Sequence, residues 1–191
     1  MRKENPKSRI CKAAFGLFYQ NGYQATAINE ILEKSASHKK SYYRYFRNRE
    51  DLGKEYLKQK EQHYLNFILE LSKKHNDFQI FWKFWVSFLK RDISRKDFNG
   101  CPIANFSIYN RRDFKIQIKS FIVAWDFVLF QYLQKSVYKD RKFNQSKIQE
   151  FSKKIMLLYE GALITYIMSN DNNFINYLHD EVLFLAERYI E

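Results

Sequence analysis

Residues 26–52 read TAINEILEKSASHKKSYYRYFRNREDL, and this stretch decides how the whole chain is interpreted. Residues 28–32 and residues 38–45 each have helical spacing, and the small residues 35–37 separate them. Two short helices joined by a tight turn are typical of a helix-turn-helix, whose second helix lies in the major groove of DNA. Thr26 stands where the first of these helices needs an N-cap.

The second short helix is predicted to have an inner and an outer face. Tyr42 and Phe46 are four residues apart and can pack inward together. Cations and hydroxyl groups then make up the outer face, which consists of Lys39, Lys40, Ser41, Tyr43, Arg44 and Tyr45. Cations neutralise phosphates, and hydroxyl and guanidinium groups contact base edges, so this face indicates DNA binding. The alternative interpretation is a solvated basic helix whose tyrosines are half-buried against a neighbour.

The positive charge of the chain is concentrated at its N-terminal end. The net charge is +12, and residues 1–60 hold 14 Lys and Arg against 6 Asp and Glu. Such asymmetry suits a polyanionic partner, either a nucleic acid or an anionic membrane surface. Composition alone leaves a plain solubility charge equally open.

Helical periodicity recurs along the rest of the 191 residues, and Gly (5) and Pro (2) are scarce, which favours helices over turn-rich β-structure. The first helix is expected over Pro6–Asn21, ended by Gly22. Asn48 is a second N-cap, with Asp51 as its partner in a capping box, and starts a long helix to about residue 73. Further helices are expected near 77–94, 101–110, 113–138, 146–169 and 173–190. We therefore predict an all-α fold of about nine helices.

The same N-terminal residues resemble the TetR/AcrR family of transcriptional regulators. Matching positions stand in register at Ala13, Ala14, Leu17, Phe18, Gly22, Thr26, Ile31, Tyr43, Phe46, Glu50, Asp51 and Leu52. The resemblance implies a DNA-binding domain over residues 1–52 and a helical effector-binding and dimerisation domain over residues 53–191. It also implies phosphate or base contacts from Thr26, Lys39, Ser41, Tyr43 and Tyr45, and a backbone contact from Arg49.

The chain departs from the family pattern in and after the turn. Ala36 replaces the turn glycine, and an alanine held in the left-handed conformation costs about 1 kcal/mol. His38 replaces the usual Ser cap, a loss of similar size, and Ser37 is the alternative cap. Lys40 replaces a small residue and adds charge beside the DNA.

The C-terminal two thirds are rich in aromatic residues, and residues 99–105 and 158–162 resemble the LmrA/YxaF-like branch of the family. An aromatic-lined pocket suits a hydrophobic or aromatic effector. The candidate ligand residues are Trp82, Trp85, Phe88, Cys101, Asn105, Tyr109, Phe121, Trp125 and Tyr159. For each aromatic residue the alternative is plain core packing, and for Cys101 a structural thiol is weighed against a redox trigger.

The last two helices are expected to pair with a second copy of the chain as a four-helix bundle, as the resemblance implies. The candidate interface residues are Leu158, Ala162, Leu163, Tyr166, Leu178, Val182 and Leu185. Gly161 and Ala162 would allow close helix approach. A twofold dimer presenting two recognition helices requires a near-palindromic operator.

No pattern for catalysis, a metal or a cofactor emerges, so we expect no enzyme. The N-terminus lacks a signal peptide, and the apolar run 121–130 is interrupted by Asp126 and too short for a membrane span, so we expect a cytoplasmic protein with no membrane partner. Its expected partners are double-stranded DNA, a second copy of itself and a small-molecule effector. The competing hypothesis is a helical scaffold of the same descent that has lost specific DNA recognition.

Overall fold

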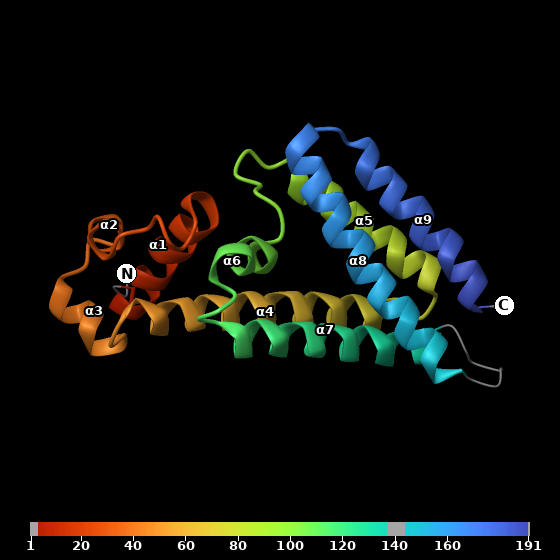
Figure 1. The fold of residues 1–191 in the computed structure, drawn as a ribbon, viewed down its shortest axis with the longest axis horizontal. Helices are drawn as coiled ribbons and strands as arrows, with labels where there is room; N and C mark the ends of the chain where they lie inside the picture. Colours follow the sequence, from red (N-terminus) through yellow and green to blue (C-terminus); the bar gives the residue numbers. More distant parts are fainter. Residues whose placement is uncertain (1–3, 137–143, 191) are drawn as a thin grey trace. The chain divides into compact units, whose positions relative to one another are not determined.

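The computed structural model describes residues 4–136 and 144–190, and this part of the chain is all-α (Figure 1). Its helices are α1 (Pro6–Asn21), α2 (Ile28–Lys34), α3 (Lys39–Tyr45), α4 (Arg49–Lys74), α5 (Phe78–Ile93), α6 (Pro102–Asn110), α7 (Lys115–Ser136), α8 (Gln145–Ser169) and α9 (Asn173–Ile190). No strand occurs in either described range. The predicted fold class is confirmed. The last two residues of the helix predicted over 113–138 lie outside the described residues.

The chain packs as two compact units, residues 1–62 with 102–120 and residues 63–101 with 121–191. The sequence led us to expect a division after residue 52. In the structure, the helix-turn-helix shares its packing unit with the first half of α4 and with α6, because aromatic side chains from these segments form one core. A functional boundary at residue 52 stays a prediction.

The core of the first unit is built from aromatic rings, most of which meet edge to face. The rings are Phe15, Phe18, Tyr23, Tyr56, Phe106 and Phe114, with neighbouring centroids 4.9 to 5.7 Å apart. Such pairs stabilise a core beyond the area that they bury. Gly53 on α4 permits this packing, because a Cβ there would lie 2.7 Å from Cζ of Phe114.

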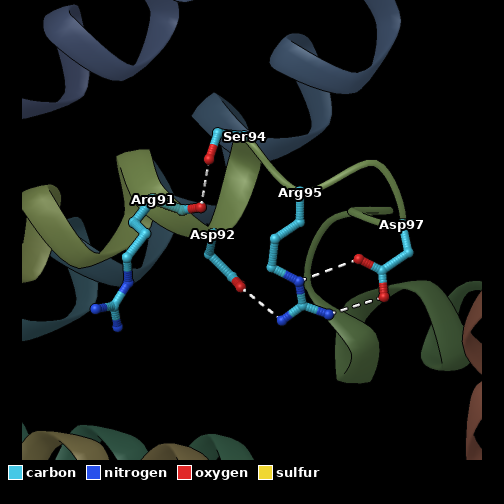
Figure 2. A network of polar contacts seen from close by, with 5 residues as sticks. All are labelled: Arg91, Asp92, Ser94, Arg95 and Asp97. Atoms are coloured by element: carbon cyan, nitrogen blue, oxygen red, sulfur yellow. Dashed lines mark hydrogen bonds and ion pairs between the residues drawn. The ribbon is translucent and has the colours of Figure 1, made fainter.

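In the second unit, α5, α8 and α9 lie side by side (Figure 1). The indole of Trp82 on α5 donates a 3.2 Å hydrogen bond to the backbone carbonyl of His179 on α9. Beyond α5 the chain turns, and the guanidinium of Arg95 pairs with both carboxylate oxygens of Asp97 and with Asp92 (Figure 2). Exposed ion pairs add little stability. These two pairs link residues of the segment between the end of α5 and Cys101 to one another.

Helix α7 is long and apolar enough to cross a membrane by length and composition, the one such helix in the described residues. We had expected no segment of that length, because Asp126 interrupts the apolar run. A single helix of this kind is weak evidence for a membrane protein, since the core helix of a soluble protein passes the same test. Phe121, Trp125 and Leu129 of α7 are buried in the second unit.

Candidate functional site

Helix α1 packs against both α2 and α3, and it has the predicted bounds. Its N-cap is Asn5, whose side-chain oxygen accepts a 2.9 Å hydrogen bond from the backbone N–H of Lys7. Gly22 follows its last residue with a φ of 86°, a conformation that suits glycine. One face of this helix is buried, and it consists of Ile10, Ala14, Leu17 and Phe18.

The start of α2 corrects one expectation. Ala27, not Thr26, is the N-cap, and it has no side-chain oxygen to offer. Thr26 is fully buried, and its hydroxyl donates a 2.8 Å hydrogen bond to the backbone carbonyl of Gly22. The structure therefore gives this side chain an internal role, and its contact with DNA stays a prediction.

The turn between α2 and α3 carries the departures that the sequence singled out. Ala36 has a φ of 46°, the left-handed conformation expected where the family has glycine. His38 is the N-cap of α3 and makes no side-chain cap hydrogen bond. The alternative cap, Ser37, is excluded, because its hydroxyl donates to the carbonyl of Ser35 and α3 begins at Lys39. The recognition helix therefore starts from a strained and uncapped turn.

The two faces of α3 are as predicted. Tyr42 and Phe46 are buried with ring centroids 5.7 Å apart, and the hydroxyl of Tyr42 donates to the carbonyl of Asn48. Burial raises the pKa of Tyr42 to about 12, so this hydroxyl stays a neutral donor. Asn48 in turn accepts a 2.9 Å hydrogen bond from the backbone N–H of Asp51, which confirms it as the cap of α4.

The outer face of α3 is open. The side chains of Lys39, Lys40, Tyr43 and Arg44 are exposed, and those of Ser41 and Tyr45 are half-buried. Within the described ranges, no ion pair engages any of the three cations of this face. We call these six residues the outer face of α3. It can meet a polyanion without first breaking an internal salt bridge.

Arg49 is held inside the first unit. Its guanidinium donates to the side-chain oxygen of Gln24 at 3.0 Å and to the carbonyl of Thr26 at 3.1 Å, and it lies 4.2 Å from the centre of the Tyr23 ring. The predicted contact with the DNA backbone is untested, and these bonds give the residue a structural role as well. Sequence reasoning missed Gln24, because an exposed loop glutamine carries no pattern that distinguishes it.

Seven of the nine candidate ligand residues belong to the second unit, and five of them are grouped here. Trp85, Phe121, Trp125 and Tyr159 are buried with ring centroids 5.5 to 6.0 Å apart along the contacts that join them, and the thiol of Cys101 is buried in the same unit. Tyr64 on α4, which the sequence did not single out, stacks on Trp125 at 6.0 Å. We call these residues, together with Glu160, the aromatic cluster.

Of the remaining four candidate ligand residues, Trp82 lies beside the cluster, with its ring 5.6 Å from that of Trp85, and the other three lie elsewhere. Asn105 and Tyr109 are on α6 in the first unit, and Tyr109 is 81% exposed. The indole of Trp82 is held against α9 by its hydrogen bond to the carbonyl of His179. The ring of Phe88 packs on that of Phe67, with the two centroids 4.6 Å apart. Helical spacing could not separate these residues from the cluster, because nearly every face of this region carries aromatic side chains.

The predicted dimer residues are also divided by the structure. Leu163 and Val182 are buried within the protomer, whereas Leu178, also buried, lines a groove between α8 and α9. Leu158, Ala162, Tyr166 and Leu185 are half-buried. The exposed apolar side chains of α8 and α9 are others, namely Leu157, Ile164, Ile167, Met168, Tyr177 and Phe184. The interface itself stays a prediction, and helical spacing did not separate its two sides because both faces of these helices are apolar.

The described residues contain no group of three or more His, Cys, Asp or Glu side chains that could hold a metal ion. What the geometry offers is a short helix with an open cationic face and, in the other unit, a buried aromatic cluster. This combination defines the class of helix-turn-helix regulators with an all-helical second domain.

Comparison with known proteins finds a family match in the N-terminal part of the chain. The profile described as "Bacterial regulatory proteins, tetR family" matches residues 10–56. An uncharacterized HTH-type transcriptional regulator of Lactococcus lactis subsp. lactis is 29% identical over 108 residues, which are 54% of each chain. The chain thus spans about half the length of this relative. Residues 10–56 are therefore similar to the DNA-binding part of the TetR family.

Solved structures of TetR-family regulators share the fold over nearly the whole chain. One from Streptomyces coelicolor has a TM-score of 0.84 at 14% identity and covers 97% of this chain and 96% of its own. One from Agrobacterium tumefaciens has a TM-score of 0.81 at 17% identity, with 96% and 98% covered. A TetR regulator from Legionella pneumophila has 0.79 at 19% identity, with 95% and 97% covered. These proteins are named as regulators and not as enzymes.

Proposed function

We propose that this protein is a cytoplasmic, ligand-responsive transcriptional repressor that binds a palindromic operator as a homodimer and is released by a small hydrophobic or aromatic effector. The observation that carries the proposal is the outer face of α3. Its cations are exposed and have no ion pair with any residue that the structure describes, while Tyr42 and Phe46 anchor the opposite face. Cations supply affinity for any DNA, and Ser41, Tyr43 and Arg44 supply groups that can read base edges.

A second copy of the chain is proposed to pack on the outer side of α8 and α9. A groove of about 700 Å³ runs between these helices, and its lining is mostly apolar. Leu157, Gly161 and Thr165 follow one another at intervals of four residues along α8, which gives that wall a narrow, small-residue centre. Exposed apolar surface of this kind typically marks an interface.

The competing hypothesis, a scaffold that no longer reads DNA sequence, is favoured by one observation. The turn before α3 places Ala36 in a left-handed conformation and leaves α3 without a side-chain cap. A poorly held recognition helix would still attract phosphates but would discriminate bases weakly.

Selection from random double-stranded DNA separates the two hypotheses. The full-length protein is mixed with random duplexes at moderate salt, bound fragments are recovered and amplified, and the enriched sequences are compared. The repressor proposal predicts a consensus of two inverted half-sites separated by about one helical turn. Retention of DNA without any enriched sequence would favour the scaffold.

A further inference from the structure

A carboxyl group, that of Glu160, lies near the phenols of the aromatic cluster. Burial raises the pKa of Tyr64 and of Tyr159, and the charge of Glu160 raises both further. The ring of Tyr159 lies 5.5 Å from that of Trp125 and 6.0 Å from that of Trp85, and Glu160 follows Tyr159 directly on α8. The thiol of Cys101 makes a hydrogen bond with the Glu160 carboxylate. All of these residues belong to the second unit.

Two polar atoms of this cluster have no hydrogen-bond partner among the residues that the structure describes. They are the indole nitrogen Nε1 of the fully buried Trp125 and the carboxylate oxygen Oε2 of Glu160, and both atoms are buried. A buried polar atom left without a partner costs about 1–3 kcal/mol, and a charged one costs more. An unused donor and an unused acceptor in one cluster therefore favour a bound polar molecule.

The carboxylate also lacks a counterion. In the described parts of the chain, no ion pair involves Glu160, although the protein carries a net charge of +12. Burial raises the pKa of Glu160 to about 6, which still leaves the group largely ionised at neutral pH. A buried anion is normally paired with a cation.

We infer that the effector is an organic cation with an aromatic body, whose ammonium group pairs with the Glu160 carboxylate against the faces of Trp85, Trp125 and Tyr159. This inference rests on the proposed function, because it assigns the effector to the aromatic cluster. Aromatic faces attract cations most strongly where water is excluded. An acceptor atom on the same molecule would receive the N–H of Trp125.

Other ligand classes fit this cluster less well. An anion would be repelled by Glu160, and a hydrocarbon would leave both unpartnered atoms unsatisfied. The rings are in contact with one another, so a ligand must separate them to bind. That separation would couple occupancy of the cluster to the conformation of the second unit.

The inference is tested with three probes that share a naphthalene ring, namely 1-naphthylmethylamine, 1-naphthalenemethanol and 1-naphthoate. They carry a positive charge, no charge and a negative charge at pH 7.5. Binding to the full-length protein is measured by calorimetry and by quenching of tryptophan fluorescence. We expect the amine to bind at least tenfold more tightly than the alcohol and the carboxylate to bind most weakly.

Glu160→Gln should abolish the preference for the amine over the alcohol, whereas Glu187→Gln, at an exposed position of α9, should keep it. Cooperative thermal unfolding of each variant verifies its fold. The inference is overturned if the alcohol binds as tightly as the amine, if Glu160→Gln keeps the preference, or if no probe binds at millimolar concentration, as when an ordered water satisfies the two atoms. Binding of the wild-type protein to its selected DNA, measured separately, decides the proposed function independently.

Discussion

The side-chain amide of Gln24 donates a 2.7 Å hydrogen bond to the side-chain oxygen of Asn110, 86 residues further along the chain. The amide nitrogen of the buried Asn110 donates in turn to the carbonyl of Phe106, also at 2.7 Å. Arg49 donates to the side-chain oxygen of Gln24 from the first turn of α4. One network within the first unit thus joins the loop before α2, the start of α4 and the end of α6, and it holds the helix-turn-helix in place.

Gln24→Ala should lower the free energy of unfolding by about 1–2 kcal/mol, because it leaves the buried oxygen of Asn110 without its donor and removes one of the acceptors of Arg49. Chemical denaturation monitored by circular dichroism measures the change. Gln59→Ala is the matched control, since Gln59 is exposed on α4 in the same unit, and it should change stability by less than about 0.5 kcal/mol. Equal effects of the two substitutions would argue against the network.

Ala36→Gly should raise the free energy of unfolding by about 1 kcal/mol. The alanine has a φ of 46°, and glycine adopts that conformation without a Cβ clash. The same substitution in a helix interior has the opposite sign, so Ala124→Gly in α7 should destabilise by about 0.5–1 kcal/mol. Urea melts of both variants test the pair. A destabilised Ala36→Gly variant would show that the turn is not strained.

His38→Ser should also stabilise the protein, by about 1 kcal/mol. His38 occupies the N-cap of α3 without a side-chain hydrogen bond, and a serine there can accept one from a backbone N–H of the first turn. His38→Ala controls for the loss of the imidazole and should be close to neutral. If His38→Ser and His38→Ala have the same free energy of unfolding, a side-chain cap at the start of α3 does not stabilise the protein.

The sequence analysis succeeded where one physical pattern dominated. The bounds of α1, the inner pair Tyr42 and Phe46 and the left-handed Ala36 followed from helix spacing and from the family pattern. Prediction from the sequence was ambiguous where two faces of one helix have the same apolar spacing. Both faces of α8 are apolar, so buried Leu163 was taken for an interface residue.

Long-range polar partners were beyond the reach of local patterns. The bond between Gln24 and Asn110 joins residues 86 positions apart, and no spacing rule links them. Thr26 illustrates the same limit on a smaller scale. Its hydroxyl turned inward to the carbonyl of Gly22, and Ala27 became the cap. Glu160 lies in the stretch 158–162 that resembles one branch of the family, but only the structure showed that its carboxylate oxygen is buried.

The stability of the protein should depend on the ionisation of Glu160. Its folded-state pKa of about 6 lies above the ordinary value of 4.5, because burial penalises the charged form. Between these values the folded state binds more protons than the unfolded state, so the contribution of this group to the free energy of unfolding falls as pH rises. Glu160→Gln has no titrating group at this position and does not lose this stability. The free energy of unfolding of the variant, minus that of the wild type, should therefore rise by about 2 kcal/mol between pH 4 and pH 8.

Denaturant melts of wild type and Glu160→Gln at a series of pH values measure that difference directly. Glu187→Gln, on the exposed side of α9, should follow the wild-type curve at every pH. A constant difference between wild type and Glu160→Gln across this range would mean that the carboxyl group titrates as it does in water.

The claim on which everything else depends is that the outer face of α3 contacts DNA. It is tested most directly by the affinity of the Tyr43→Ala, Arg44→Ala double variant for the DNA sequence selected by the wild-type protein, set against an exposed control pair, Tyr109→Ala with Arg112→Ala. We predict a loss of about 100-fold or more for the α3 variant, a shallower dependence of its affinity on salt, and little change for the control. Unchanged affinity of the α3 variant for that sequence would contradict the claim.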